Sequence, residues 1–431
     1  MALVIKNARL IDPQVGIDGV LDLKIGDDGL IAEVGENLDA TGCEVRDLTG
    51  RILVPGLMDC HVHLREPGQE YKEDVYSGTL AAAYGGFTDI VSMPNTTPET
   101  DDADTVELVK EAAARAGFVH VHPSGACTKD RKGEALADIG DMVHHGIVML
   151  TDDGCNVQNS GMMRTVMDYA AQFNIPVSSH CQDAALVGAG QVNEGVVSTR
   201  LGLAGWPCEG EEVHVDRDIR IGELTGCHAH IQHLTCARAL DIVRQAKARG
   251  ANVSCEVTPH HLFLNEDCID ESYNTNFKVN PPLRTKEDNA ALIEGICDGT
   301  VDIIVTDHAP HAAWEKDREF ELAPFGMIGI ETSLGSILTW LVRPGIIDYA
   351  RMIELMSINP RVLTHLPAVK LEAGSSADLT VFDPEIVWDV TPTCFHSKSA
   401  NSGFIGKQLV GKATDTFVAG KPILVNGEVQ R

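Results

Sequence analysis

LMDCHVHL, residues 57–64, is the stretch that most constrains the fold. It begins as an apolar strand and ends with two histidines, His61 and His63, one residue apart. Because alternate residues of a strand point to the same side, both imidazoles face one way and Val62 faces the other. Two histidines on one side of a strand end predict a functional site at that end of the strand.

Seven similar apolar segments follow along the chain, and helical segments lie between most of them. DTVELVKEAAARAG and RALDIVRQAKARG have a helical pattern, and the second ends at a glycine typical of a helix cap. Eight strands separated by helices over about 300 residues are typical of a (β/α)8 TIM barrel. A doubly wound open sheet is the alternative, but no glycine-rich phosphate turn follows the first strand. The other predicted strands are residues 88–94, 120–126, 147–153, 175–180, 229–234, 252–257 and 302–308.

Both ends of the chain have a different pattern, in which short β-type runs alternate with turns. The C-terminal end includes VNGEV, residues 425–429, an Asn-Gly hairpin signal. We therefore predict an α/β protein with two domains. Residues 1–55 and 368–431 form a small β-sandwich domain, and residues 56–367 form the barrel.

Composition excludes several classes of partner. The 431 residues have a formal net charge of −29, which argues against nucleic acid or an anionic membrane as the main partner. The N-terminus lacks a signal-peptide pattern, and no apolar run approaches the roughly 20 residues needed to span a bilayer. The twelve cysteines show no C-x-x-C pair and are typical of reduced thiols. We expect a cytoplasmic protein, and an anionic small substrate remains compatible with the charge.

Ligand-type side chains lie at the ends of the predicted strands. In a TIM barrel these ends surround one mouth, where active sites lie. Imidazoles and carboxylates that converge there are suited to a divalent metal such as Zn²⁺. The residues concerned are His61, His63, Asp152, Asp153, His180, His233 and Asp307.

Other histidines also lie on or near predicted strands, and four of them bear on the site. We interpret His228 and His230, on the strand that leads to His233, as packing or surface residues. His260 and His261 follow the seventh strand and could reach the mouth, so a role behind the metal ligands stays open for them.

Motifs along almost the whole chain resemble a known family. They are DCHVHLREPG, AAAYGGFTDIVSMPNTTP, TDDG, SSHCQD, HIQHLT, EVTPHHL, FKVNPPLR and VTDHAPH, in that order, with INPRVLTHL and ADLTVFDP after them. The chain resembles the amidohydrolase superfamily and, within it, the dihydroorotase family of the long bacterial type. The resemblance implies the reversible cyclisation of N-carbamoyl-L-aspartate to L-dihydroorotate, a step of pyrimidine synthesis.

The resemblance also implies the roles of individual residues. It implies one or two Zn²⁺ ions and makes Asp307 the catalytic acid–base. Alignment with the D-D-G motif selects Asp153 as a ligand over Asp152, which then lies behind the ligands or forms the turn. The implied ligands are His61, His63, Asp153, His180, His233 and Asp307. The implied substrate contacts are His63, Arg65, Asn95, Asn280 and His311, with main-chain contacts from Phe325 and Gly326.

One feature of many relatives is missing from this sequence. Those relatives bridge two metals with a carboxylated lysine from the fourth strand. Here no lysine lies between Lys132 and Lys247, so the fourth, fifth and sixth strands offer none. Either Asp153 bridges two metals or the site holds one.

Two competing hypotheses remain. The first is another cyclic amidohydrolase, a dihydropyrimidinase or hydantoinase or an allantoinase; Arg65, which is suited to a ring carboxylate, and the absent lysine argue against it. The second is a catalytically inactive scaffold for aspartate transcarbamoylase, although all six ligand residues are present. The partners that the sequence leaves open are a second copy of the chain, in a homodimer, and aspartate transcarbamoylase. Residues 154–174 and 309–328 are expected to form loops over the mouth.

Overall fold

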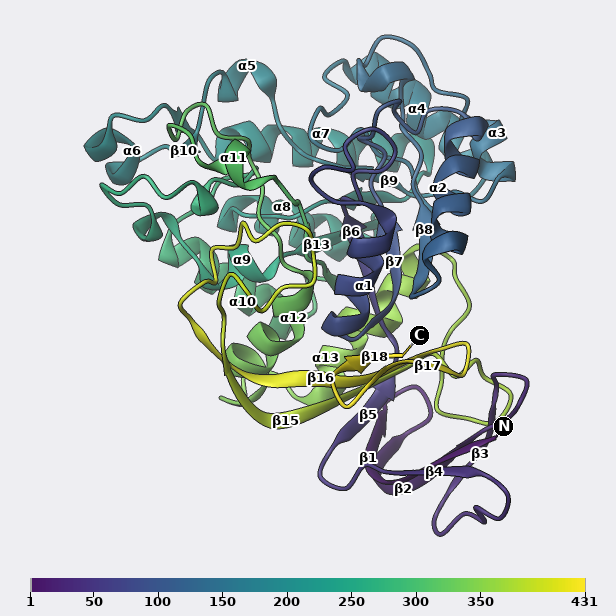
Figure 1. Ribbon diagram of the computed structural model, residues 1–431. Helices are drawn as coiled ribbons and strands as arrows, with labels where there is room; N and C mark the ends of the chain where they lie inside the picture. The colour runs from purple at the N-terminus through teal and green to yellow at the C-terminus, as the bar shows by residue number, and fades with distance from the viewer. Residues whose placement is uncertain (1, 431) are drawn as a thin grey trace.

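The computed structural model describes residues 2–430, and its largest sheet is built from both ends of the chain (Figure 1). Nine strands pair in the order β18-β17-β16-β15-β5-β1-β2-β3, and β4 pairs with β1. Strand β5 links the N-terminal strands to the C-terminal strands, because it pairs in parallel with β1 and antiparallel with β15. The strands are β1 (Leu3–Asp12), β2 (Ile17–Ile25), β3 (Ile31–Gly35), β4 (Glu44–Asp47), β5 (Ile52–Pro55), β15 (Leu379–Asp389), β16 (Gln408–Val418), β17 (Lys421–Val425) and β18 (Glu428–Val429).

The predicted hairpin at the C-terminal end is confirmed. Val425 of β17 pairs with Glu428 of β18 in an antiparallel register. Asn426 and Gly427, the two residues between them, have φ of 51° and 77°. Two consecutive left-handed residues make the tight turn that an Asn-Gly pair favours.

Parallel strands alternate with helices in the middle of the chain, so the predicted α/β class is confirmed. They form two sheets, β6-β7-β8 and β14-β13-β12-β9. Single parallel bridges from Leu150 to Gly125 and Val177 link one pair of edges, and a bridge from Val62 to His308 links the other. The predicted strand 147–153 forms only these bridges. The strands are β6 (Leu57–Val62), β7 (Phe87–Ser92), β8 (His120–Pro123), β9 (Val177–Ser179), β12 (Ala229–Ile231), β13 (Val253–Val257) and β14 (Ile303–Ile304).

The helices cover these parallel strands (Figure 1). Helix α2 begins after the capping side chain of Asp102 and is followed by Gly117, which caps it with the left-handed φ of 70°. The expectation of a loop over residues 154–174 is wrong for most of that range, because α4 occupies it. The longer helices are α1 (Val75–Gly85), α2 (Ala103–Ala116), α4 (Ser160–Gln172), α7 (Glu209–Thr225), α8 (Ala237–Ala248), α10 (Lys286–Asp298) and α12 (Ile330–Ile337).

Shorter elements complete the structure. Two-residue strands, β10 (Val192–Asn193) and β11 (Gly205–Trp206), pair with each other. No helix within residues 2–430 is long and apolar enough to cross a lipid bilayer. The short helices are α3 (Ile139–His144), α5 (Ala184–Val187), α6 (Val196–Leu201), α9 (Pro259–Phe263), α11 (Ala313–Lys316), α13 (Tyr349–Ile353) and α14 (Asn359–Leu363).

A buried ion pair fixes the start of the parallel strands. Arg361 of α14 donates to Asp89 of β7 at 2.5 Å and to the main-chain oxygen of Gly56, just before β6, at 3.0 Å. His122 of β8 donates to the other oxygen of Asp89 at 2.9 Å. Burial opposes the charge of Asp89, but Arg361 and His122 outweigh it and hold the pKa of the carboxyl well below its usual value. One guanidinium therefore joins the N-terminal ends of adjacent strands.

We predict that Arg361→Met lowers the free energy of unfolding by about 3–5 kcal/mol, because it leaves the carboxylate of Asp89 buried without its main counter-charge. Urea denaturation followed by circular dichroism measures the change. Arg164→Met removes an exposed arginine paired with Asp168 on α4 and should change stability by about 0.5 kcal/mol or less. Equal effects of the two substitutions would contradict the assignment.

Candidate active site

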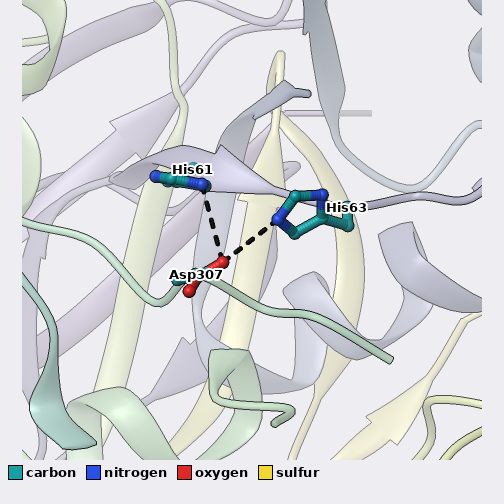
Figure 2. A group of neighbouring side chains, drawn as sticks. All are labelled: His61, His63 and Asp307. Carbon is teal, nitrogen blue, oxygen red and sulfur yellow. Dashed lines mark hydrogen bonds and ion pairs between the residues drawn. The ribbon is translucent and has the colours of Figure 1, made fainter. Parts of the chain in front are cut away.

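Three predicted ligands meet where β6 and β14 end (Figure 2). His61 lies near the end of β6, His63 follows that strand, and Asp307 lies three residues beyond β14. Nε2 of His63 is 3.1 Å and Nε2 of His61 is 3.5 Å from Oδ1 of Asp307. The two histidines of the H-x-H motif therefore face one carboxylate, as their spacing on a strand predicts.

The other three predicted ligands join the same cluster. Oδ1 of Asp153 lies 3.4 Å from Nε2 of His61, and 3.8 Å from both Nδ1 of His180 and Nε2 of His233. His180 and His233 are 2.8 Å apart through Nδ1 and Nε2. Two groups of ligand atoms, each lying within 4.8 Å of one another, share His61. They are His61, His63 and Asp307, and His61, Asp153 and His233.

Three residues at this site have left-handed backbone conformations. The φ of Arg65 is 61°, that of His233 is 28° and that of Asp307 is 44°. Such a conformation costs a residue with a side chain about 1–3 kcal/mol, and it persists only where the surrounding structure imposes it. The fold therefore holds these side chains in the cluster at some cost to local stability.

Glu256 of β13 is a site residue that sequence reasoning missed. Its Oε1 accepts from Nδ1 of His61 at 2.7 Å and from the backbone N–H of His233 at 3.2 Å, and its Oε2 accepts from Nε2 of His230 at 3.0 Å. His230, interpreted from the sequence as a packing or surface residue, therefore contacts the same carboxylate as His61. A carboxylate near the end of the predicted strand 252–257 was the signal that could have identified Glu256.

The cluster carries an excess of buried negative charge. Burial opposes protonation of His61, but Asp153, Glu256 and Asp307 outweigh it and raise the pKa of this imidazole well above its usual value. Nε2 of His61 is buried and has no hydrogen-bond partner. A cation beside that nitrogen would satisfy the imidazole and balance the carboxylates at once.

The donor set fits a divalent metal ion. Burial and the neighbouring His233 lower the pKa of His180 to about 4, which leaves this imidazole neutral and able to donate a lone pair. Because Nδ1 of His61 is directed at Glu256, its Nε2 is the nitrogen available for a metal. Imidazoles mixed with carboxylates suit a borderline ion such as zinc, and harder ions bind such sets as well.

A cavity of about 190 Å³ opens above the cluster. Arg65 lies in its wall and donates through Nε to the main-chain oxygen of Pro310 at 3.2 Å. Burial lowers the pKa of Arg65 to about 10, so the guanidinium stays protonated at neutral pH. The wall contains every residue that the sequence predicts as a substrate contact: His63, Arg65, Asn95, Asn280, His311, Phe325 and Gly326.

Several polar atoms of this wall are already oriented. Nδ1 of His63 hydrogen bonds with Oδ1 of Asn95 at 2.8 Å, and Nε2 of His311 donates to the main-chain oxygen of Phe325 at 2.7 Å. By contrast, Oδ1 of Asn280 and Nδ1 of His311 are buried without hydrogen-bond partners. These two atoms are available to a ligand in the cavity.

The remaining candidates lie outside the cavity wall. Asp152 accepts from the backbone N–H groups of Cys127 and Thr128, at 2.8 and 3.2 Å, so it supports the neighbouring segment. His261 hydrogen bonds with Thr258 Oγ1 and with the main-chain oxygen of Pro281, at 2.8 and 2.9 Å. His260 is buried, and its Nε2 has no partner.

We predict that Glu256→Gln lowers the affinity for a divalent metal by about 10- to 100-fold, because it removes the charge that orients His61 and raises its basicity. Competition with a chromogenic chelator measures that affinity. Glu223→Gln, at an exposed position of α7, is the matched control and should leave it unchanged. Equal metal affinity in the Glu256 variant and the wild type would show that this carboxylate does not act on the ligands.

Comparison with known proteins identifies the family. A family model described as dihydro-orotase-like matches residues 50–238. The chain is 45% identical over 424 residues to a dihydroorotase of Pelotomaculum thermopropionicum, covering 98% of this chain and 99% of that protein. It is 46% identical over 424 residues to a dihydroorotase of Ruminiclostridium cellulolyticum, with the same coverage.

Solved structures share the fold. An L-hydantoinase (dihydropyrimidinase) from Arthrobacter aurescens superposes with a TM-score of 0.89 at 24% identity, covering 100% of this chain and 97% of that one. A D-hydantoinase (dihydropyrimidinase) from a Thermus species has a TM-score of 0.86 at 26% identity, with coverage of 99% and 96%. The much higher identity to dihydroorotases, over nearly the full length of both chains, shows that this chain belongs to the dihydroorotase family.

Proposed function

We propose that the protein catalyses the reversible cyclisation of N-carbamoyl-L-aspartate to L-dihydroorotate in pyrimidine synthesis. The observation that carries the proposal is that a buried arginine and a cluster of imidazoles and carboxylates open into one cavity. The ring of dihydroorotate contains a cyclic amide and bears a carboxylate. Its hydrolysis needs an activated water beside the amide and a fixed cation beside the carboxylate, and the cavity provides groups for both.

We propose one or two Zn²⁺ ions as the cofactor, held by His61, His63, Asp153, His180, His233 and Asp307. Bound Zn²⁺ supplies hydroxide at neutral pH and polarises a carbonyl. No carboxylated lysine is part of the proposal, because no lysine lies between Lys132 and Lys247 in the sequence. Asp153, which lies within 3.8 Å of four candidate histidines, would be the shared ligand if two ions were bound.

Asp307 is the proposed acid–base. Burial raises the pKa of its carboxyl, but His61 and His63 outweigh that effect and hold the pKa below its usual value, so the group is ionised and able to accept a proton. In hydrolysis Asp307 takes the proton of the attacking water and delivers it to the departing ring nitrogen. In cyclisation it takes the proton of the attacking nitrogen and delivers it to the departing hydroxyl group, which leaves as water.

Arg65 is the proposed partner of the substrate carboxylate. Its buried guanidinium can form a bidentate pair that is stronger than an exposed one, because little water competes. Burial and the charge of Arg65 hold the pKa of His311 well below its usual value, so His311 is neutral and offers Nδ1 for a hydrogen bond. Asn95 and Asn280 then contact the ring, with main-chain contacts from Phe325 and Gly326.

A dihydropyrimidinase, hydantoinase or allantoinase is the second candidate, since the solved hydantoinases share this fold. Those enzymes do not need a cation for a ring carboxylate, and the buried Arg65 favours dihydroorotate. An inactive scaffold for aspartate transcarbamoylase would have no reason to keep six ligand residues in one strained, buried cluster.

We also infer the finer architecture. The two parallel sheets and their single bridges are the (β/α)8 barrel of residues 56–367, and the terminal segments 1–55 and 368–431 are a β-sandwich domain. Support comes from the pairing order, which returns to β6 through the bridge from Val62 to His308. A cytoplasmic location, a homodimer and a complex with aspartate transcarbamoylase stay predictions.

A ring-opening assay on L-dihydroorotate, dihydrouracil and allantoin, with metal content measured by mass spectrometry, tests the proposed function. We expect metal-dependent turnover of dihydroorotate alone. Turnover of dihydrouracil or allantoin without dihydroorotate would replace the proposal with the second candidate. Absence of turnover of all three would favour the scaffold.

We predict that Asp307→Asn lowers kcat by about 10²–10⁴-fold in both directions, because the amide cannot carry the proton between water and nitrogen. Five of the six candidate ligands remain, so metal content should stay close to that of the wild type. Steady-state kinetics in the two directions and metal analysis measure these outcomes. Retention of wild-type kcat would remove the assigned role.

We predict that Arg65→Met raises KM for dihydroorotate at least about tenfold, because a charged hydrogen bond contributes about 1.5–3 kcal/mol. Arg115→Met, at an exposed arginine of α2, is the matched control and should leave KM unchanged. A second comparison uses a ring analogue without the carboxylate, whose binding should not distinguish Arg65→Met from the wild type. Unchanged KM in the Arg65 variant would exclude it as the carboxylate partner.

A further inference from the structure

A segment outside the predicted barrel reaches the cavity. Residues 390–407 connect β15 to β16 and were assigned from the sequence to the small terminal domain. In Figure 1 this connection, drawn in yellow, rises from the terminal sheet to lie beside α9. Its Phe404 is buried in one hydrophobic cluster with Leu264 and Val279, which belong to the middle of the chain. The connection is therefore packed onto the part of the molecule that holds the candidate active site.

Asn401, within this connection, uses its whole side-chain amide on the cavity wall. Its Nδ2 donates to the main-chain oxygens of Ala309 and Gly326, both at 3.1 Å. Its Oδ1 accepts from the backbone N–H of His311 at 3.1 Å. Its main-chain oxygen accepts from Ile328 at 2.9 Å, and the residue is only 5% exposed. Through its side chain and its main-chain oxygen, Asn401 thus joins two separate stretches, residues 309–311 and 326–328.

The wall at this point has little free space. Ala309, His311 and Gly326 all line the cavity. Gly326 has φ of 124°, and a Cβ there would lie 2.7 Å from Cβ of Ala309 and 3.2 Å from Nε2 of His311. A small relative movement of the two stretches would therefore change both the shape of the cavity and the direction of the His311 imidazole.

Other contacts hold the connection in place without Asn401. Ser399 donates through Oγ to the main-chain oxygen of Lys72 at 2.8 Å, and the backbone N–H of Lys398 donates to Glu73 at 3.2 Å. Ser397 also donates to the buried carboxylate of Glu73. Loss of the Asn401 side chain would consequently leave the connection attached and remove three hydrogen bonds from the wall, where the backbone hydrogen bond from Ala309 to Met327, at 2.9 Å, still joins the two stretches.

We propose that Asn401 is a positioning residue, which sets the spacing of the two wall stretches and thereby aligns His311 and Gly326 with the substrate. The inference rests on the proposed function, because these wall residues are the proposed substrate contacts. It assigns the terminal segment a part in substrate binding, although none of its residues is a proposed ligand or acid–base.

Kinetics of Asn401→Ala and Asn401→Asp test the proposal. We expect KM for dihydroorotate to rise about 10- to 100-fold, with a smaller fall in kcat and an unchanged metal content, since misplaced contacts weaken binding without altering the cluster. The Asp variant keeps the acceptor for His311 but directs a carboxylate oxygen at two carbonyl oxygens, so its defect should equal or exceed that of Ala. Ser399→Ala, which removes another anchor of the same connection, should keep KM within about twofold of the wild type.

Amide hydrogen exchange gives a readout without substrate. In both Asn401 variants, peptides covering residues 309–328 should exchange faster than in the wild type, whereas in Ser399→Ala they should not. If Asn401→Ala does not fold, Asn401→Ser, whose shorter side chain cannot reach both stretches, takes its place. The proposal would be overturned if the Asn401 variants had the same kinetics as Ser399→Ala. It would also be overturned if kcat and 1/KM fell by the same factor in the Asn401 variants. A wild type without dihydroorotate turnover would instead refute the proposed function, and exchange would still report on the contact.

Discussion

Three carboxylates buried around one imidazole are the constraint on which the site depends. Asp153, Glu256 and Asp307 all lie within 3.5 Å of ring nitrogens of His61, where little water is present to screen their charges. Such an arrangement is stable only if positive charge sits among the carboxylates. The carboxylates of the folded chain therefore favour a bound cation at this site.

Stability and chemistry occupy opposite ends of the parallel strands. At their N-terminal ends, Arg361 joins Asp89 to the start of β6 with a satisfied ion pair. At or beyond their C-terminal ends, Nε2 of His61 and Nδ1 of His311 are left without hydrogen-bond partners. The anchored end can therefore support the unsatisfied groups at the other end, a division that is typical of enzymes built on parallel strands.

Local rules predicted the parts of the site that depend on neighbours in sequence. The two-residue period of a strand placed His61 and His63 on one side, and the strand endings indicated the other ligands. Glu256 escaped prediction because its role appears only in the folded chain, where β13 pairs with β12 and the Glu256 carboxylate also reaches His61 of β6. Asn401 was not predicted because it contacts Ala309 from about 90 residues later in the chain. The sequence pattern had also assigned these two residues to different domains. Contacts between residues far apart in sequence cannot be predicted from the periodicity of single strands and helices.

The position of β5 has a consequence for how the chain folds. Its residues 52–55 pair with β1 close by and with β15 more than 300 residues later, so one edge of β5 stays open until the end of the chain is made. Contacts of such high sequence separation form slowly. During synthesis the nascent chain holds every candidate metal ligand long before Asn401 emerges. The enzyme would therefore be able to acquire its ion before it has a finished pocket for substrate.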